Sequence, residues 1–152
     1  TTVGGKREFN KDMGAIVMAH RIPYVATACI SYPEDLYKKV TKAKKIRGPK
    51  YIEILTPCPP GWRFSMDKTV EVGRLAVETG AWPLYECENG KMSFNGFSKL
   101  ILEGKVKRKP IEEWLKMQGR FRNLFKPKRD EERIRKIEEF IERMWENFRS
   151  KV

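Results

Sequence analysis

The chain has 152 residues, of which 40% are hydrophobic and 34% are charged, and its formal net charge is +12. This length and apolar content suit one domain, or a large part of one, with a buried core. The three cysteines are too few and too irregularly spaced for a disulfide framework, and no apolar run reaches membrane-spanning length. We therefore expect a soluble cytoplasmic protein, and the excess of Lys, Arg and Glu is typical of thermophiles.

The first predicted elements are a helix, a strand and a second helix. The chain opens at Thr1 without a methionine or the start of an element, which indicates entry part-way into a domain. Residues 12–20 predict a short helix, and the apolar run 22–30 is typical of a strand covered on both faces. A capping box with a proline in the first turn, at residues 31–34, predicts a helix that ends before Gly48.

A second predicted strand leads into the most informative motif of the chain. Residues 51–55 follow the helix, so strand, helix and strand predict a right-handed parallel βαβ unit. The motif Thr-Pro-Cys-Pro-Pro-Gly-Trp at residues 56–62 comes next, and its prolines restrict the backbone on both sides of Cys58. The motif indicates either a rigidly presented functional sulfur or a small buried hydrophobe in a turn.

The predicted topology places Cys58 at the mouth of the sheet. In open α/β sheets ligands bind beyond the carboxyl ends of the strands, and the Cys58 motif leaves such an end. Cys29 lies at the corresponding end of the preceding strand. Either both thiols face one crevice, or Cys29 is a core residue, as free cysteines more often are.

The second half of the chain predicts a hairpin between helices. Residues 65–79 have helical periodicity, and residues 84–94 predict two strands joined by an Asn-Gly turn. Pro110 opens a further helix. The last helix, over residues 130–148, has one apolar stripe rich in aromatic residues, so it covers either its own domain or a neighbouring subunit.

The positive charge is concentrated in the C-terminal part of the sequence. Residues 91–152 contain 18 basic and 10 acidic residues, against 14 and 10 in residues 1–90. The densest basic segments are residues 105–109 and 120–129. Such a surface attracts polyanions or acidic proteins, and a merely solvated face is the alternative.

Several common catalytic and metal sites have no motif in this sequence. It contains no C-x-x-C pair, no H-E-x-x-H, no G-x-G-x-x-G and no Walker loop. The only histidine, His20, stands at a predicted helix end, where it more often complements the helix dipole than acts as a base. We therefore do not expect self-contained hydrolysis.

Several segments together carry a resemblance to a known family. They are residues 11–12, 19–28, 32–36, 48–49, 57–62 and 73–80, and the most specific motifs in them are Pro-Cys-Pro-Pro-Gly-Trp and Ala-Val-Glu-Thr-Gly. With these motifs the chain resembles the C-terminal half of the β subunit of archaeal-type 2-oxoacid:ferredoxin oxidoreductases, in particular the pyruvate and 2-oxoisovalerate enzymes. The resemblance covers most of the chain and weakens after about residue 125.

The resemblance implies both a fold and a function. The fold is α/β and is half of a thiamine diphosphate-binding fold, with a parallel βαβ core, a hairpin and C-terminal helices. Residues 1–94 are then the C-terminal part of that domain, and residues 95–152 are a basic helical extension that packs on the domain or on a partner subunit. The implied function is oxidative decarboxylation of pyruvate or a branched-chain 2-oxoacid to acyl-CoA, in a complex in which this chain is inactive alone.

The resemblance also implies cofactors, which are a [4Fe–4S] cluster and thiamine diphosphate with Mg²⁺. Cys58 matches the family's fourth cluster ligand, whereas the other three ligands and the thiamine and Mg²⁺ motifs belong to the half that this chain does not match. Cys29 departs from the family pattern, which has a small residue such as serine there, and Cys87 is most simply a strand residue. We therefore expect no catalytic and no thiamine-binding residue here.

The implied partners are the N-terminal half of the same β subunit, the α, γ and δ subunits, ferredoxin, the 2-oxoacid and coenzyme A. A rival function from a different class is a basic nucleic-acid-binding module that uses residues 120–129, with Phe121 and Phe125 as stacking groups. This rival explains the charge but gives Cys58 no role. Neither nucleic acid nor a membrane is the expected partner.

Overall fold

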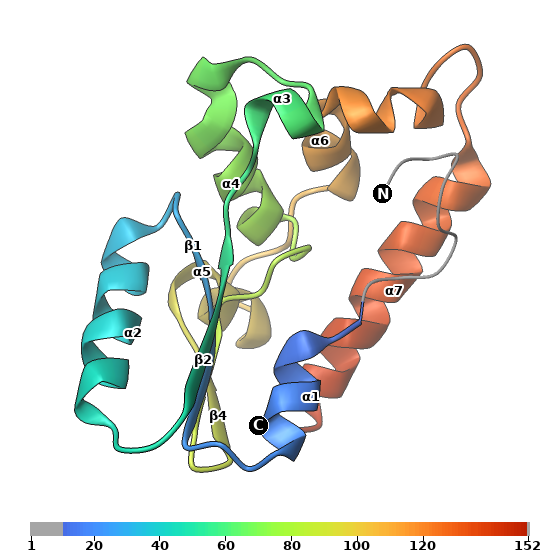
Figure 1. Cartoon of the computed structure of the whole chain (residues 1–152). Coiled ribbons are helices and arrows are strands. Elements are labelled where there is room, and N and C mark those ends of the chain that lie inside the picture. The colour runs from blue at the N-terminus through green and yellow to red at the C-terminus, as the bar shows by residue number, and fades with distance from the viewer. Residues whose placement is uncertain (1–10, 152) are drawn as a thin grey trace.

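The computed structural model describes residues 11–151, so Thr1 and the expectation attached to it lie outside the described part. Helices cover both faces of a sheet (Figure 1). No helix among the described residues combines the length and apolar composition that a membrane crossing requires. In chain order the elements, with 3-10 helices marked η, are α1 (Met13–Ala19), β1 (Tyr24–Cys29), α2 (Pro33–Lys45), β2 (Lys50–Leu55), α3 (Pro59–Trp62), η1 (Met66–Lys68), α4 (Thr69–Glu78), β3 (Tyr85–Glu88), β4 (Lys91–Phe94), α5 (Gly96–Leu102), α6 (Ile111–Lys116), η2 (Gly119–Leu124) and α7 (Glu131–Arg149).

The sheet has the strand order β2-β1-β3-β4. β1 pairs with β2 in parallel, in a register that places Cys29 opposite Leu55, and it pairs with β3 antiparallel. β3 and β4 form the hairpin, whose turn residues Asn89 and Gly90 have φ values of 49° and 82°. The predicted α/β class, the parallel βαβ unit and the hairpin are therefore confirmed, within a sheet that is mixed.

The two faces of the sheet are covered by different helices. On one face Tyr24 and Ala26 of β1 pack with Ala43 of α2, and on the other face Cys29 packs with Val77 of α4. All of β1 is buried, which confirms the prediction of a strand covered on both faces. β2 lies at an edge of the sheet, and its residues are half-buried or exposed.

A buried lysine fastens the crossover helix α2 to β1. Lys39 is 2% exposed, and its Nζ donates to the carbonyl oxygen of Thr27 at 2.8 Å and to the Asp35 carboxylate at 2.7 Å. Burial lowers the pKa of Lys39 because the charged form loses its hydration, and the hydrogen bond to Asp35 opposes that effect. These hydrogen bonds hold α2 against β1.

The last helix packs on its own chain. Tyr85 and Phe94 of the hairpin form one hydrophobic cluster with Trp145 and Phe148 of α7. The indole N–H of Trp145 donates to the carbonyl oxygen of Gly80 at 3.0 Å. Figure 1 shows α7 running along the side of the molecule away from α2. Of the two alternatives for its apolar stripe, cover of its own chain is the observed one.

Local predictions around two helix starts are wrong. α2 begins at Pro33 with Tyr32 as its N-cap, so Ser31 does not cap it, and the buried hydroxyl of Ser31 has no hydrogen-bond partner within the described residues. The N–H of Tyr32 donates to the carbonyl oxygen of Cys29 at 3.0 Å, and this tight turn delays the helix start by one residue. The predicted helix over residues 65–79 divides into η1 and α4, and α5 was not predicted.

Candidate functional site

Cys58 lies just beyond the carboxyl end of β2, as the sequence predicts. It is the N-cap of the single-turn helix α3, which begins with Pro59 and Pro60. Proline suits the first turn of a helix, because its fixed φ is already helical and the missing N–H would have no intrahelical acceptor. The predicted stiff loop is thus a short helical turn with an exposed thiol at its start. The alternative of a small buried hydrophobe is wrong for Cys58.

The surroundings of the Cys58 sulfur leave space on one side. A Cβ placed on Gly61 would lie 3.2 Å from the Sγ of Cys58, so glycine keeps this space open. The N–H of Trp62 donates to the carbonyl oxygen of Cys58 at 2.8 Å and closes the turn. Because Pro59 and Pro60 have no N–H, the amide of Gly61 is the first backbone donor of the turn. An exposed sulfur with open space beside it suits a thiolate ligand of a soft metal centre.

The 3-10 helix η2 holds the end of α3. Arg63 follows α3 with a left-handed φ of 61°, and its carbonyl oxygen accepts a hydrogen bond from the N–H of Gly119 at 2.9 Å. A Cβ on Gly119 would lie 2.7 Å from that oxygen, so a larger residue would force the two segments apart. Two segments that are distant in sequence are therefore joined next to the turn that carries Cys58.

Arg120 lies among aromatic rings beside this contact. Its Cζ is 3.8 Å from the ring centroid of Trp62, 4.7 Å from that of Phe121 and 6.0 Å from that of Trp114. Its Nε donates to the side-chain oxygen of Gln118 at 2.8 Å. Burial lowers the pKa of Arg120 to about 10, so the guanidinium remains charged at neutral pH. Sequence reasoning missed this arrangement, although Trp114 before Arg120 and Phe121 directly after it were a signal for it.

The other two cysteines are enclosed. Cys29 is 0% exposed, and its Sγ makes a weak hydrogen bond to the carbonyl oxygen of Gly73 at 3.7 Å. Cys87 is a buried residue of β3, as predicted. Burial raises the pKa of both thiols, because the thiolate is poorly solvated inside the protein. Of the two alternatives for Cys29 the core residue is the observed one, and exposure singles out Cys58 among the three cysteines.

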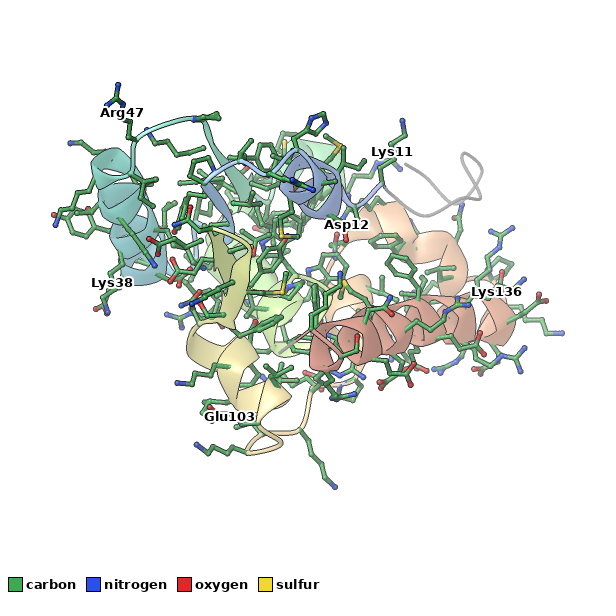
Figure 2. The ribbon with its side chains drawn as sticks, turned by 90° about the horizontal axis from the view of Figure 1, so that it is seen from below. Lys11, Asp12, Lys38, Arg47, Glu103 and Lys136 are labelled. Carbon is green, nitrogen blue, oxygen red and sulfur yellow. The ribbon has the colours of Figure 1, made fainter. Side chains whose placement is uncertain are left out.

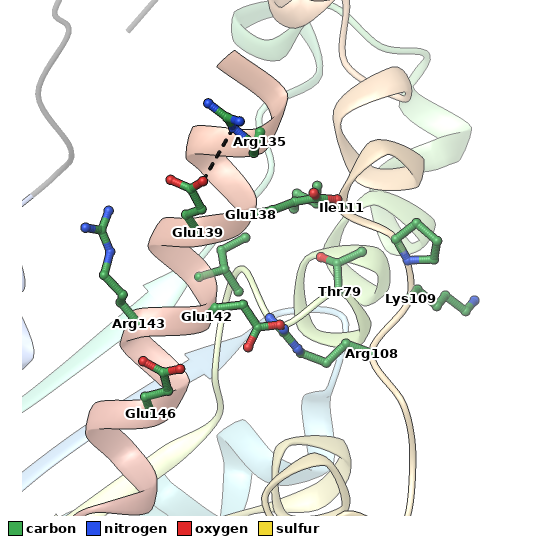
Figure 3. A pocket seen from close by; sticks show the side chains of 12 residues that line it. Thr79, Arg108, Lys109, Ile111, Arg135, Glu138, Glu139, Glu142, Arg143 and Glu146 are labelled. Carbon is green, nitrogen blue, oxygen red and sulfur yellow. Dashed lines mark hydrogen bonds and ion pairs between the residues drawn. The ribbon is translucent and has the colours of Figure 1, made fainter. Parts of the chain in front are cut away.

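A groove of about 690 Å³ lies beside α7, and its lining is mainly charged rather than thiol-containing (Figure 3). Two pairs of its charged side chains form ion pairs, Arg108 with Glu142, and Arg135 with Glu139 at 3.4 Å. Its lining contains none of the cysteines and not His20, which is the exposed C-cap of α1. Across residues 11–151 no group of three or more His, Cys, Asp or Glu side chains is placed to hold a metal ion. Cys58 is therefore the candidate functional residue.

The two basic segments are partly engaged by other side chains. In residues 120–129, Arg120 lies among aromatic rings, and Phe121 and Phe125 pack against the core around α7. These rings are not free to stack on bases, so the nucleic-acid alternative loses its stacking contacts. In residues 105–109, the cations with carboxylate partners are Lys105 with Glu103, Arg108 with Glu142, and Lys109 with Glu78.

Positive charge is also carried by α2 and the turn after it. Figure 2 shows Lys38 and Arg47 pointing away from the body of the molecule at the two ends of this segment. Within this segment only Lys39 and Lys42 have carboxylate partners among the described residues, at Asp35 and on β3. The field of the molecule therefore extends over the N-terminal half as well, which the sequence count alone did not indicate.

Comparison with known proteins gives relatives along nearly the whole chain, although no protein-family model matches it. The chain is 50% identical over 140 residues to the pyruvate synthase subunit PorB of Methanocaldococcus jannaschii, a match that covers 92% of the chain and 43% of that subunit. It is 46% identical over 153 residues to the ketoisovalerate oxidoreductase subunit VorB of Pyrococcus abyssi, covering 97% of the chain and 46% of VorB. The chain is a homologue of PorB and VorB subunits.

The homology with PorB and VorB confirms the resemblance that the motifs carry. A second PorB subunit, from Methanothermobacter marburgensis, is 46% identical over 154 residues and is matched over 49% of its length by 98% of this chain. The chain thus spans about half the length of the PorB and VorB relatives it matches. PorB and VorB subunits match the chain at similar identity.

Proposed function

We propose that this chain is part of the β subunit of a ferredoxin-dependent 2-oxoacid oxidoreductase. In this enzyme pyruvate or a branched-chain 2-oxoacid is oxidatively decarboxylated to acyl-CoA. The observation that carries the proposal is the identity of 46–50% with PorB and VorB subunits over almost the entire chain. The chain is inactive alone, because a complex of subunits performs the reaction.

In this proposal Cys58 is the fourth thiolate ligand of a [4Fe–4S] cluster. The exposed thiol and the space kept by Gly61 support this role. A [4Fe–4S] cluster takes four thiolates and carries single electrons. Cys29 and Cys87 are enclosed in the core, so the other three ligands come from a part of the subunit that this chain does not span.

The same proposal assigns the chain a scaffold role toward thiamine diphosphate and Mg²⁺. The cofactor supplies the decarboxylation chemistry when it is bound, and its binding motifs are in the part of the subunit outside this chain. We take residues 1–94 as the C-terminal part of the thiamine diphosphate-binding domain and residues 95–152 as its basic helical extension. The mixed sheet and its covering helices support an α/β half of such a domain.

The rest of the β subunit joins this chain at β2. Among residues 11–151 β2 pairs only with β1, and the carbonyl oxygen of Leu55 accepts from the N–H of Ile30 at 3.2 Å. Polar groups alternate along a strand, so those of Ile54 point to the open edge. Ile54 is 40% exposed, and open apolar edges are normally covered in folded proteins. Other exposed apolar side chains on the helices next to β1 and β2 are Met13, Ile16, Tyr37 and Val40.

Replacing Ile54 with proline removes the outward N–H of the β2 edge and leaves the pairing with β1 intact. We expect the variant chain to fold but to recover at least about tenfold less of the co-expressed N-terminal half of the M. jannaschii PorB subunit, because strand addition depends on backbone hydrogen bonds. Ile54→Val keeps the N–H and is the matched control. Equal recovery with the proline and valine variants, measured after affinity purification, would show that the edge is not the joining surface.

The remaining partners follow from the same assignment. They are the α, γ and δ subunits, ferredoxin, the 2-oxoacid and coenzyme A. The formal net charge of +12 supports an encounter with an acidic redox partner such as ferredoxin, because opposite charges speed association. Three free cysteines, two of them buried, support a site of action in the reducing cytoplasm.

The experiment that tests the function is a 2-oxoacid assay on the complete complex that contains this chain, purified without oxygen. The complex is given pyruvate or 2-oxoisovalerate together with coenzyme A and ferredoxin. We expect reduction of ferredoxin with at least one of the two acids, and none when coenzyme A or this chain is left out. A cofactor-loaded complex that reduces ferredoxin with neither acid would contradict the proposal.

A further inference from the structure

The helix that carries Cys58 is too short to be stable by itself. α3 has four residues, and no side chain caps its start at Cys58. A single helical turn fixes several backbone angles for one hydrogen bond, so an isolated turn is strongly disfavoured. Three backbone hydrogen bonds close this turn: Trp62 N–H donates to the carbonyl oxygen of Cys58 at 2.8 Å, and the N–H groups of Arg63 and Phe64 donate to that of Pro59. Contacts from outside α3 must therefore supply the stability that keeps the Cys58 thiol in one place.

Those contacts come mainly from Arg120. The guanidinium lies over the ring of Trp62 at 3.8 Å, and Trp114 packs edge-on against the same ring at 6.1 Å. Both side chains are half-buried, and a guanidinium stacked on a tryptophan ring is a favourable cation–π contact. The N–H of Gly119, the residue before Arg120, donates to the carbonyl oxygen of Arg63. Adjacent residues of η2 thus hold α3 by its ring and by its backbone.

The position of Arg120 is itself fixed by a buried amide. Gln118 is 1% exposed, donates from its Nε2 to the carbonyl oxygen of Trp114 at 2.8 Å, and accepts from the Nε of Arg120. The ion pairs found in residues 11–151 pair the neighbouring Arg129 with carboxylates but include none for Arg120. The partners of Arg120 are thus aromatic faces and the Gln118 oxygen instead of a carboxylate. Such partners suit a residue that positions its neighbours better than one that forms a surface ion pair.

We propose that Arg120 is the positioning residue of the Cys58 turn, and that its stack on Trp62 holds the thiol in the orientation in which it ligates the cluster. This inference rests on the proposed function for the ligand role of Cys58. The positioning of the turn itself is independent of any cluster. The planar guanidinium is required because a lysine has the charge but cannot cover the indole ring in the same way.

The first test uses the purified chain without a cluster. Hydrogen exchange of the Trp62 and Phe64 amides is measured by mass spectrometry in wild type, Arg120→Met, Arg120→Lys and the exposed neighbour Arg122→Met. We expect exchange about tenfold faster in Arg120→Met, an intermediate rate in Arg120→Lys and a wild-type rate in Arg122→Met. Circular dichroism shows whether each variant is folded. Unchanged exchange at both amides in a folded Arg120→Met chain would overturn the proposal.

The second test uses the complete, cluster-loaded subunit. We expect the electron paramagnetic resonance spectrum of the reduced cluster to change in Arg120→Met, to recover partly in Arg120→Lys and to stay as wild type in Arg122→Met. An unchanged spectrum in Arg120→Met would overturn the link between Arg120 and the cluster. The two proposals fail separately: retention of the full cluster by Cys58→Ser would refute the ligand role, while the exchange experiment would still report on the turn.

Discussion

Replacement of Cys58 by serine is expected to remove the fourth thiolate of the [4Fe–4S] cluster. A serine oxygen is a harder and poorer ligand for the cluster iron than a thiolate sulfur. The complete subunit, reconstituted with iron and sulfide without oxygen, should therefore lose about one iron in four or more relative to wild type. Iron and sulfide are measured by chemical analysis, and the visible absorption of the cluster should weaken in parallel.

The matched controls for Cys58→Ser are Cys29→Ala and Cys87→Ala. Both change a cysteine, but each lies in the core, so the variants should keep the full iron and sulfide content. A folded Cys58→Ser subunit with the iron content of wild type would remove Cys58 as a ligand. Loss of iron in a folded Cys29→Ala subunit would instead indicate that this enclosed thiol moves into the cluster site.

Truncation of Trp145 to alanine is expected to lower the free energy of unfolding by about 3–5 kcal/mol. Trp145 is 0% exposed, and its ring centroid lies 5.8 Å from that of Phe94 and 6.0 Å from that of Phe148. The variant leaves a cavity and also deprives the carbonyl oxygen of Gly80 of its donor. Since a domain of this size is stable by only about 5–15 kcal/mol, the loss is a large fraction of the total.

The unfolding of the Trp145→Ala chain is measured by urea titration, with Asn147→Ala as the control. Asn147 is an exposed residue of the same helix, so its truncation should change the free energy of unfolding by less than about 0.5 kcal/mol. Equal stability of the two variants would mean that α7 does not dock on the hairpin in solution. That result would instead favour the other alternative, in which the apolar stripe of α7 covers a neighbouring subunit.

Those parts of the fold that depend on short-range patterns were predictable from the sequence. The uninterrupted apolar run of β1 predicted burial on both faces, and Asn89-Gly90 predicted the hairpin, because each signal depends on a few adjacent residues. The location of Cys58 beyond β2 followed from the same βαβ argument. The chemical role of its sulfur did not follow, since that role came from the resemblance to a family.

The parts that sequence reasoning missed depend on contacts between distant segments. Ser31 fits the capping pattern, but the turn closed onto Cys29 makes Tyr32 the cap. Arg120 belonged to a basic run and was assigned to the surface, whereas its partner Trp62 comes from the Cys58 motif. No periodicity within either segment predicts that they meet, because the meeting depends on how α6 and η2 fold back on α3.

The distribution of the three sulfurs has a practical consequence for handling the protein. Cys29 and Cys87 are buried, so the exposed thiol of Cys58 has no exposed cysteine to pair with in its own molecule. When air oxidises this thiol, the bond it forms must reach a second molecule or a small thiol in the buffer. We therefore expect that disulfide-linked dimers, which a reductant separates, form during aerobic preparation. They should not be taken for the native assembly.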